Sequence, residues 1–116
     1  MTKSPSTAGL PAVHPGAYLR DDILPFHPAR KKVEIAQALG ITRMALDEIL
    51  KGERSVTPAT ALKLGQLFGT SAETWLRLQA AYDLKIARDQ LADQLAAIPR
   101  WQPEKAEAPG MTDFGA

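Results

Sequence analysis

The chain has 116 residues, of which 45% are hydrophobic and none is cysteine, and its net charge is +1. This length and apolar share suit one compact domain with tails, and the lack of cysteine excludes a disulfide framework, a thiolate zinc site and a thiol nucleophile. No apolar run approaches the roughly 18 residues that a membrane span needs, and the N-terminus lacks the pattern of a secretory signal. We therefore expect a cytoplasmic protein that does not enter a membrane.

The two ends of the chain differ in composition from the segment between them. Residues 1–13 are rich in Ser, Thr, Pro, Gly and Ala without periodicity, and residues 99–116 contain three prolines and two glycines. Such stretches bury little apolar surface and are seldom held to a fold. We expect a flexible N-terminal arm over residues 1–13, one domain over 14–98 and a flexible tail over 99–116.

A sharp corner between two short helices is predicted around Gly40. Apolar residues recur at helical spacing on both sides of it, so both helices turn an apolar face toward a shared core. Gly40 ends the first helix, because glycine enters the left-handed conformation without a Cβ clash. Thr42 follows as the expected N-cap of the second helix. This arrangement is typical of a helix-turn-helix, in which the second helix enters the DNA major groove.

Three further helices complete the predicted fold. One precedes the corner, at about residues 16–24. Another begins at Thr57 and Pro58, an N-cap followed by proline at the first helical position, and ends at Gly69. The last is long, at about residues 71–98, and stops where a proline prevents continuation. The sequence therefore predicts an all-α, five-helix domain with a long C-terminal helix.

The exposed face of the second corner helix carries the candidate base contacts, which are Thr42, Arg43, Met44, Asp47 and Glu48. Arg43 suits a bidentate contact with guanine, Met44 suits packing on a thymine methyl group, and Glu48 or Asp47 could accept from cytosine N4. For Arg43 we favour the DNA contact. The two acidic residues are equally compatible with a solvated face that forms i,i+4 ion pairs, such as Arg43 with Asp47.

Three cations near this face suit contacts with DNA phosphates: Lys32, Lys51 and Arg54. Residues 30–54 carry six cations and four anions, so one copy would bind DNA weakly and a homodimer is expected.

The last helix has an apolar stripe that extends beyond the predicted core. This stripe either packs on a partner or folds back on the first helix, and the residues that we assign to a dimer interface are Ile86, Leu91, Leu95 and Ile98.

Catalytic and metal sites find little support in the sequence. His14 and His27 each adjoin a proline outside the helices, and they lack both the i,i+4 spacing of a helical metal pair and clustered carboxylates. A surface histidine that caps or lines a turn is the preferred interpretation. No glycine-rich loop follows a strand, since no convincing strand is present. We expect no enzymatic activity, no cofactor and no metal ion.

Four stretches resemble the HigA family of antitoxins, a branch of the XRE/Cro-type helix-turn-helix proteins. They are residues 14–20, 35–43, 49–58 and 68–84, and the resemblance extends over residues 14–98. The part from Trp75 to Leu84 is the most specific, because generic helix-turn-helix repressors lack it.

This resemblance implies a lambda-repressor-like dimer with two activities. It would neutralise a HigB-like toxin, an mRNA endonuclease of the RelE class, and with that toxin as co-repressor it would repress its own operon. The two reading helices of a two-fold dimer would lie one DNA turn apart, about 34 Å, which requires a palindromic operator in double-stranded DNA.

The reading helix departs from the family pattern, in which polar residues usually occupy several positions that are here Met44, Ala45, Asp47 and Glu48. Lys51 also stands where Asn is frequent. The operator sequence therefore cannot be carried over. Two other hypotheses share the same evidence: a stand-alone transcription regulator without a toxin, and a protein-interaction module whose DNA site has decayed.

Overall fold

Every regular element between residues 13 and 104 is a helix. The computed structural model describes this range, and no strand occurs within it, so the all-α prediction is confirmed. Residues 1–12 and 105–116 lie outside the described part of the chain, and with them most of the predicted arm (1–13) and tail (99–116). No helix of the described range is long and apolar enough to cross a membrane.

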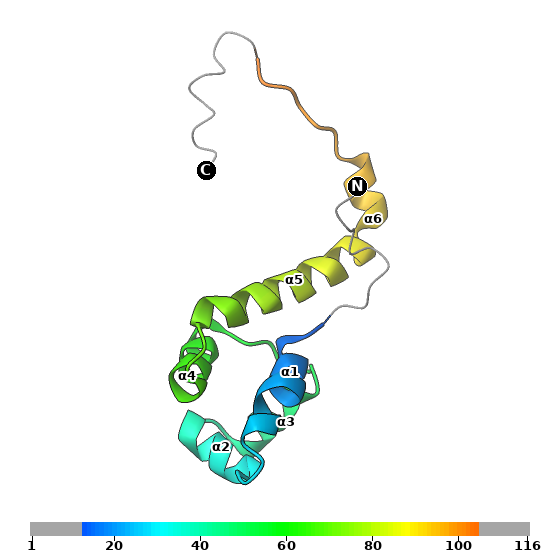
Figure 1. Ribbon diagram of the computed structural model, residues 1–116. Coiled ribbons are helices and arrows are strands. Elements are labelled where there is room, and N and C mark those ends of the chain that lie inside the picture. Colours follow the sequence, from blue (N-terminus) through cyan, green and yellow to red (C-terminus); the bar gives the residue numbers. More distant parts are fainter. Residues whose placement is uncertain (1–12, 105–116) are drawn as a thin grey trace.

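The helices follow one another in the predicted order up to α5. In chain order they are α1 (Pro15–Tyr18), α2 (Lys32–Leu39), α3 (Arg43–Leu50), α4 (Pro58–Phe68), α5 (Ala72–Gln90) and α6 (Ala92–Ala97) (Figure 1). α1 runs on through a π-helical turn (Leu19–Ile23) and a 3-10 turn (Leu24–Phe26). These three pieces together form the first predicted helix.

Local signals fix the corner between α2 and α3 where the sequence predicted it. Gly40 ends α2 in the left-handed conformation, with φ 73°. Thr42 caps α3, and its Oγ1 accepts a hydrogen bond from the backbone N–H three residues later at 2.9 Å. Thr57 and Ser71 cap α4 and α5 in the same way. Each cap supplies a partner for an N–H that the first helical turn leaves unpaired.

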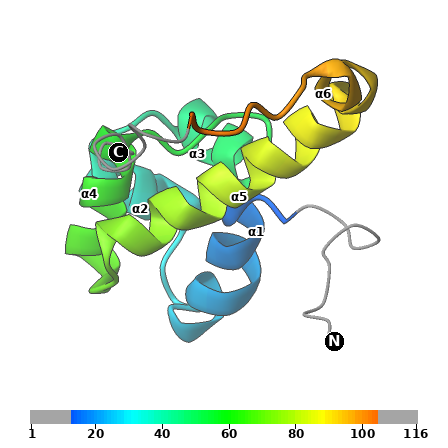
Figure 2. The ribbon, with the colours of Figure 1, turned by 90° about the horizontal axis from the view of Figure 1, so that it is seen from above.

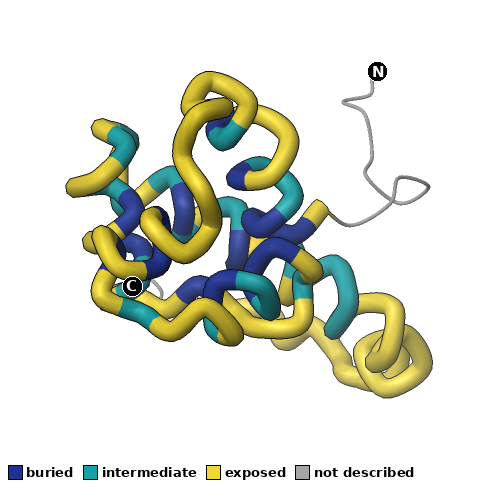
Figure 3. Tube along the Cα trace, turned by 90° about the horizontal axis from the view of Figure 1, so that it is seen from below, coloured by how far each residue is buried: buried dark blue, intermediate teal, exposed yellow. Residues whose placement is uncertain are grey.

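The core lies between α1, α2, α3, α4 and the first half of α5, which crosses over the other helices (Figures 2 and 3). Trp75 of α5 is completely buried. Its Nε1 donates to Thr70 Oγ1 at 2.7 Å, which satisfies the one polar group of the indole. The buried hydrophobic residues are Leu19, Ile23, Ile35, Ala36, Leu39, Leu46, Ile49, Leu50, Val56, Ala61, Leu64 and Trp75.

The two histidines differ in their surroundings. His27 is exposed and lies in a turn, with its ring 5.4 Å from that of Phe68. His14 is buried, so the prediction of a surface histidine is wrong there, although it does cap a helix. Its Nδ1 accepts the backbone N–H of Gly16 at 2.8 Å, and its ring packs edge-on against Tyr82. Burial lowers the pKa of His14, while the Asp83 carboxylate and a hydrogen bond to the backbone of Arg54 oppose that shift.

The backbone of α1 meets the C-terminal end of α3 at Gly16. A Cβ at this position would overlap the carbonyl oxygen of Ile49, so no larger residue fits without moving one of the two helices. Beside this contact, Arg20 Nη1 donates to the carbonyl oxygen of Leu50 at 3.2 Å. α1 therefore holds the end of α3 through main-chain atoms as well as through the apolar core.

The prediction of one unbroken last helix is wrong. α5 ends at Gln90, Leu91 has φ −104° and ψ 13°, and α6 begins at Ala92. Every residue from 88 to 104 is exposed. Most helix stability in proteins comes from tertiary packing, and this segment lacks the buried contacts that would hold α5 and α6 as one straight helix. Its exposure also shows that the segment does not fold back on α1 (Figure 1).

α5 has an inner and an outer side. Trp75, Gln79, Tyr82 and Ile86 recur at i, i+4, i+7 and i+11, and all four are buried or partly buried. The opposite side is apolar in its middle and bears a shallow surface groove. The residues that line the groove are Thr74, Arg77, Leu78, Ala80, Ala81 and Leu84.

We predict that Gly16→Ala destabilises the fold by about 3 kcal/mol, at the upper end of the cost of overpacking, because the new methyl group meets a main-chain carbonyl. Gly69→Ala is the control: nothing lies within 4 Å of a Cβ there, but φ is +74°, so its cost should be only about 1–2 kcal/mol. Urea unfolding of both variants measures the difference. Equal losses would contradict the close approach of α1 and α3.

Candidate nucleic-acid interface

The candidate reading face is the outer side of α3 together with its N-terminus. Thr42, Arg43 and Met44 are exposed there, Met44 by 67%. Asp47 and Glu48 follow on the same side and are partly buried. The residues that turn inward and fix α3 on the core are Leu46, Ile49 and Leu50.

Asp47 joins the N-terminal parts of α2 and α3. Its carboxylate lies 3.3 Å from Nε of Arg43, one helical turn earlier in α3, and 3.7 Å from Nζ of Lys32 in α2. The i,i+4 pair that the sequence offered as an alternative is thus present. Both cations are about half exposed, so each can reach an external anion.

Glu48 makes a separate ion pair at the other end of α3. Its Oε1 accepts from Nε and Nη2 of Arg54, at 2.8 and 2.6 Å, and this ties the loop after α3 to the helix. Lys51 is exposed and forms no ion pair with any residue in the range 13–104. Of the three predicted phosphate contacts, Lys51 is therefore the one whose charge is not already engaged by a carboxylate of the described chain.

The local charge of this face is positive but small. It has four cations and two anions: Lys32, Arg43, Lys51 and Arg54, with Asp47 and Glu48. Phosphate neutralisation supplies most of the non-specific affinity of a DNA-binding protein, and carboxylates that already hold the cations compete with it. The arrangement can thus bind the DNA backbone, but only weakly per copy.

Gln79 is a positioning residue that the sequence did not reveal. It is buried on α5, its Oε1 accepts the backbone N–H of Val56 at 2.7 Å, and its Nε2 donates to Asp83 at 2.9 Å. The loop between α3 and α4 is thereby fixed to α5. The one sequence signal for this role is a polar residue on the same helical stripe as Trp75 and Tyr82.

The four residues predicted to form a dimer interface differ in exposure. Ile86 is partly buried on the inner side of α5. Leu91, Leu95 and Ile98 are exposed by 39%, 46% and 65%, beyond the break in the helix. These three side chains, unlike Ile86, are open to a partner.

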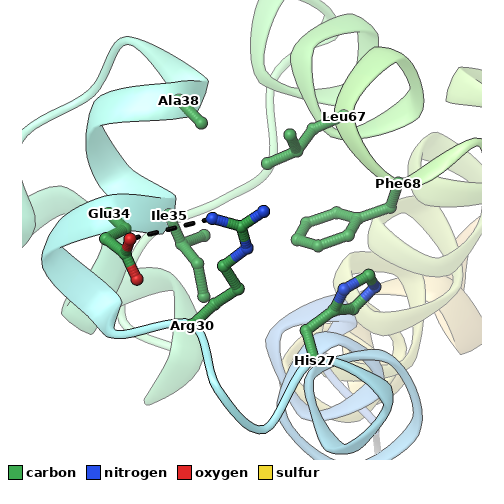
Figure 4. A pocket seen from close by; sticks show the side chains of 7 residues that line it. All are labelled: His27, Arg30, Glu34, Ile35, Ala38, Leu67 and Phe68. Atoms are coloured by element: carbon green, nitrogen blue, oxygen red, sulfur yellow. Dashed lines mark ion pairs between the residues drawn. The ribbon is translucent and has the colours of Figure 1, made fainter.

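A small cavity opens beside α2, away from the reading face. It has a volume of about 280 Å³, and its lining is His27, Arg30, Glu34, Ile35, Ala38, Leu67 and Phe68 (Figure 4). Arg30 and Glu34, two of the lining residues one helical turn apart, form an ion pair at 3.7 Å. Within residues 13–104 no group of His, Asp or Glu side chains has an arrangement that could hold a metal ion.

Sequence comparisons identify relatives along most of the chain. A helix-turn-helix family model matches residues 30–75. Virulence-associated protein I of Dichelobacter nodosus is 40% identical over 91 residues, which make up 78% of this chain and 82% of that protein.

Comparison with solved structures also identifies relatives along most of the chain. An addiction-module antidote protein of the HigA family from Coxiella burnetii is 35% identical, with a TM-score of 0.72 over 78% of this chain and 98% of that one. The antitoxin HigA of Pseudomonas aeruginosa, solved with the higBA promoter, is 29% identical, with a TM-score of 0.74 over 79% and 100% of the two chains. These relatives are antitoxins and DNA-binding proteins, not enzymes, and this chain belongs to the HigA family of helix-turn-helix proteins.

Proposed function

We propose that this protein is the antitoxin of a toxin–antitoxin pair, and that it also represses its own operon by binding a palindromic operator. The observation that carries the proposal is the exposed N-terminus of α3, with Thr42, Arg43 and Met44, in a chain of the HigA family. The Pseudomonas aeruginosa relative was solved with its own promoter, which supports a DNA-binding role for the equivalent helix here.

The proposed contacts divide between bases and phosphates. Arg43 reads a guanine, and Thr42 and Met44 lie beside it at the same helix end. Lys32, Lys51 and Arg54 contact phosphates, which set register and affinity but carry no sequence information. Asp47 is paired with Lys32 and Arg43, and Glu48 with Arg54, so the direct base contacts that the sequence also suggested for these two acids would compete with their ion pairs.

A second copy of the chain is proposed to pack on the outer side of α5. The apolar pattern there is symmetric about Ala81, with Leu78 three residues before it and Leu84 three residues after it. Two antiparallel helices that cross at Ala81 would therefore bring Leu78 of one copy against Leu84 of the other. The interface predicted from the sequence, through Ile86, Leu91, Leu95 and Ile98, is the alternative.

The proposed protein partner is a HigB-like mRNA endonuclease, as the family membership suggests. The runner-up is a stand-alone regulator without a toxin, which would use the same reading face. The two differ in whether a neighbouring reading frame encodes a protein that this chain neutralises.

We predict that expression of the reading frame adjacent to this gene arrests growth, and that co-expression of the full chain restores it. Growth curves with each protein alone and with both together measure the effect. The double variant Arg43→Ala, Lys51→Ala should still rescue growth, because the DNA contacts that it lacks are not needed to neutralise a toxin. A harmless neighbouring product would exclude the antitoxin role and favour the stand-alone regulator.

On DNA from its own promoter, Arg43→Ala should lose about 1–3 kcal/mol of binding free energy and relax the preference at one base pair. Lys51→Ala should weaken all duplexes alike and lower the slope of log affinity against log salt by about one unit. Fluorescence anisotropy titrations at several salt concentrations distinguish the two effects. If Arg43→Ala binds as the parent does, this helix end is not the reading face.

For the dimer, we predict that Leu84→Glu converts the protein to a monomer, because it buries a charge against Leu78 of the other copy in the proposed contact, while Leu95→Glu leaves the dimer intact. Sedimentation velocity of the two full-length variants measures this. The reverse result would place the interface on α6.

A further inference from the structure

The carboxylate of Asp47 lies in the middle of the reading face and contacts two cations from different helices. Nε of Arg43 is 3.3 Å from it and Nζ of Lys32 is 3.7 Å from it. The side chain of Asp47 is 31% exposed, against 52% for Arg43 and 50% for Lys32. The acid is thus set back from the surface, and the two cations extend beyond it.

The stability of α3 does not account for this pair. Arg43 is the first residue of α3, and Asp47 lies in its second half. A helix favours anions near its N-terminus and cations near its C-terminus. For i,i+4 pairs the order with the acid first is also the better one. The order of the two charges is therefore the less favourable one for α3, so helix stability gives little reason for this pair and a role in recognition is the better explanation.

Asp47 contacts only one edge of the Arg43 guanidinium. The contact is made by Nε, at 3.3–3.4 Å, and within the described residues the two Nη groups have no hydrogen-bond partner. A guanidinium reads guanine by donating two parallel hydrogen bonds to O6 and N7. A carboxylate on the Nε side fixes the plane of the guanidinium and leaves its terminal N–H groups available for that purpose.

We infer that Asp47 is a positioning residue for base recognition, which orients Arg43 toward a guanine and does not itself contact a base. The inference rests on the proposed DNA-binding function. Its second effect follows from the contact with Lys32: by holding this cation, Asp47 reduces binding to phosphates of any sequence. One carboxylate thus raises specificity in two ways, by fixing the reader and by lowering non-specific affinity.

Glu48, the next residue, provides the matched comparison. It holds Arg54 of the following loop at 2.6 Å and makes no ion pair with Arg43. Loss of its charge should therefore change affinity for all sequences alike and leave base preferences unaltered.

The experiment is selection of bound duplexes from a randomised DNA library, followed by sequencing, with the full-length parent and four variants. Arg43→Ala identifies the base pair that Arg43 reads, where the preference should fall by about 5- to 150-fold. Asp47→Ala should relax the preference at that same base pair. Asp47→Asn should keep part of the preference at that base pair, since the amide oxygen still accepts from Nε of Arg43. Glu48→Gln should keep the whole preference.

A second measurement tests the effect on Lys32. Asp47→Ala and Asp47→Asn should both bind a duplex of unrelated sequence more tightly than the parent, with a salt slope steeper by up to about one unit. Thermal unfolding of each variant checks that the fold is intact.

Two outcomes overturn the inference. If Asp47→Ala relaxes a base pair other than that of Arg43, the carboxylate contacts a base directly. If it relaxes none, the pair is a solvated surface contact without a role in recognition. A parent that enriches no sequence at all overturns the proposed DNA-binding function, and the inference with it, and this result is distinct from the other two.

Discussion

The contact between α1 and the C-terminal end of α3 is the constraint on which the reading face depends. Gly16 lets the two backbones meet at Ile49, and Arg20 donates to the carbonyl oxygen of Leu50. The contact at Gly16 is a close steric approach, since the Ile49 carbonyl already accepts the backbone N–H of Gly52 at 3.0 Å. The C-terminal end of α3 is thus held through its main chain. Arg43 lies at the opposite end of the helix, where it is exposed.

α5 extends the same support to the loop after α3. Gln79 accepts the backbone N–H of Val56, and Tyr82 packs against the ring of His14. The loop that carries Arg54 is therefore held by contacts within the fold, so DNA binding should lose little conformational entropy there. A second copy packed on the outer side of α5 would be linked to the reading helix through these contacts. The distance between two reading helices would then be set by the fold itself, as recognition of two half-sites requires.

Predictions from the sequence were accurate where short-range sterics decide the structure. Gly40 and Thr42 fixed the corner because a left-handed residue and a capping hydroxyl act on their own neighbours. Long-range features were missed. The burial of His14 depends on α5, which is distant in sequence, and the break at Leu91 arises where packing ends, with no Gly or Pro to mark it. In the site, the i,i+4 pair of Arg43 and Asp47 was one of the two alternatives that the sequence left open, whereas the link from Lys32 to Asp47 requires the tertiary arrangement of α2 and α3.

The weak positive charge of the reading face is consistent with a protein that must distinguish one operator from all other DNA. Non-specific affinity grows with each phosphate that a free cation neutralises, and here Lys32 and Arg54 are held by carboxylates. A random duplex gains little by displacing these partners, since phosphates offer the same contact everywhere. In the proposed binding mode, a duplex with a guanine at the right position in both half-sites would gain the Arg43 contact twice, which a random duplex seldom offers. In that binding mode, the small net charge of the face would thus lower binding to most DNA and leave discrimination to the side chains that reach the bases.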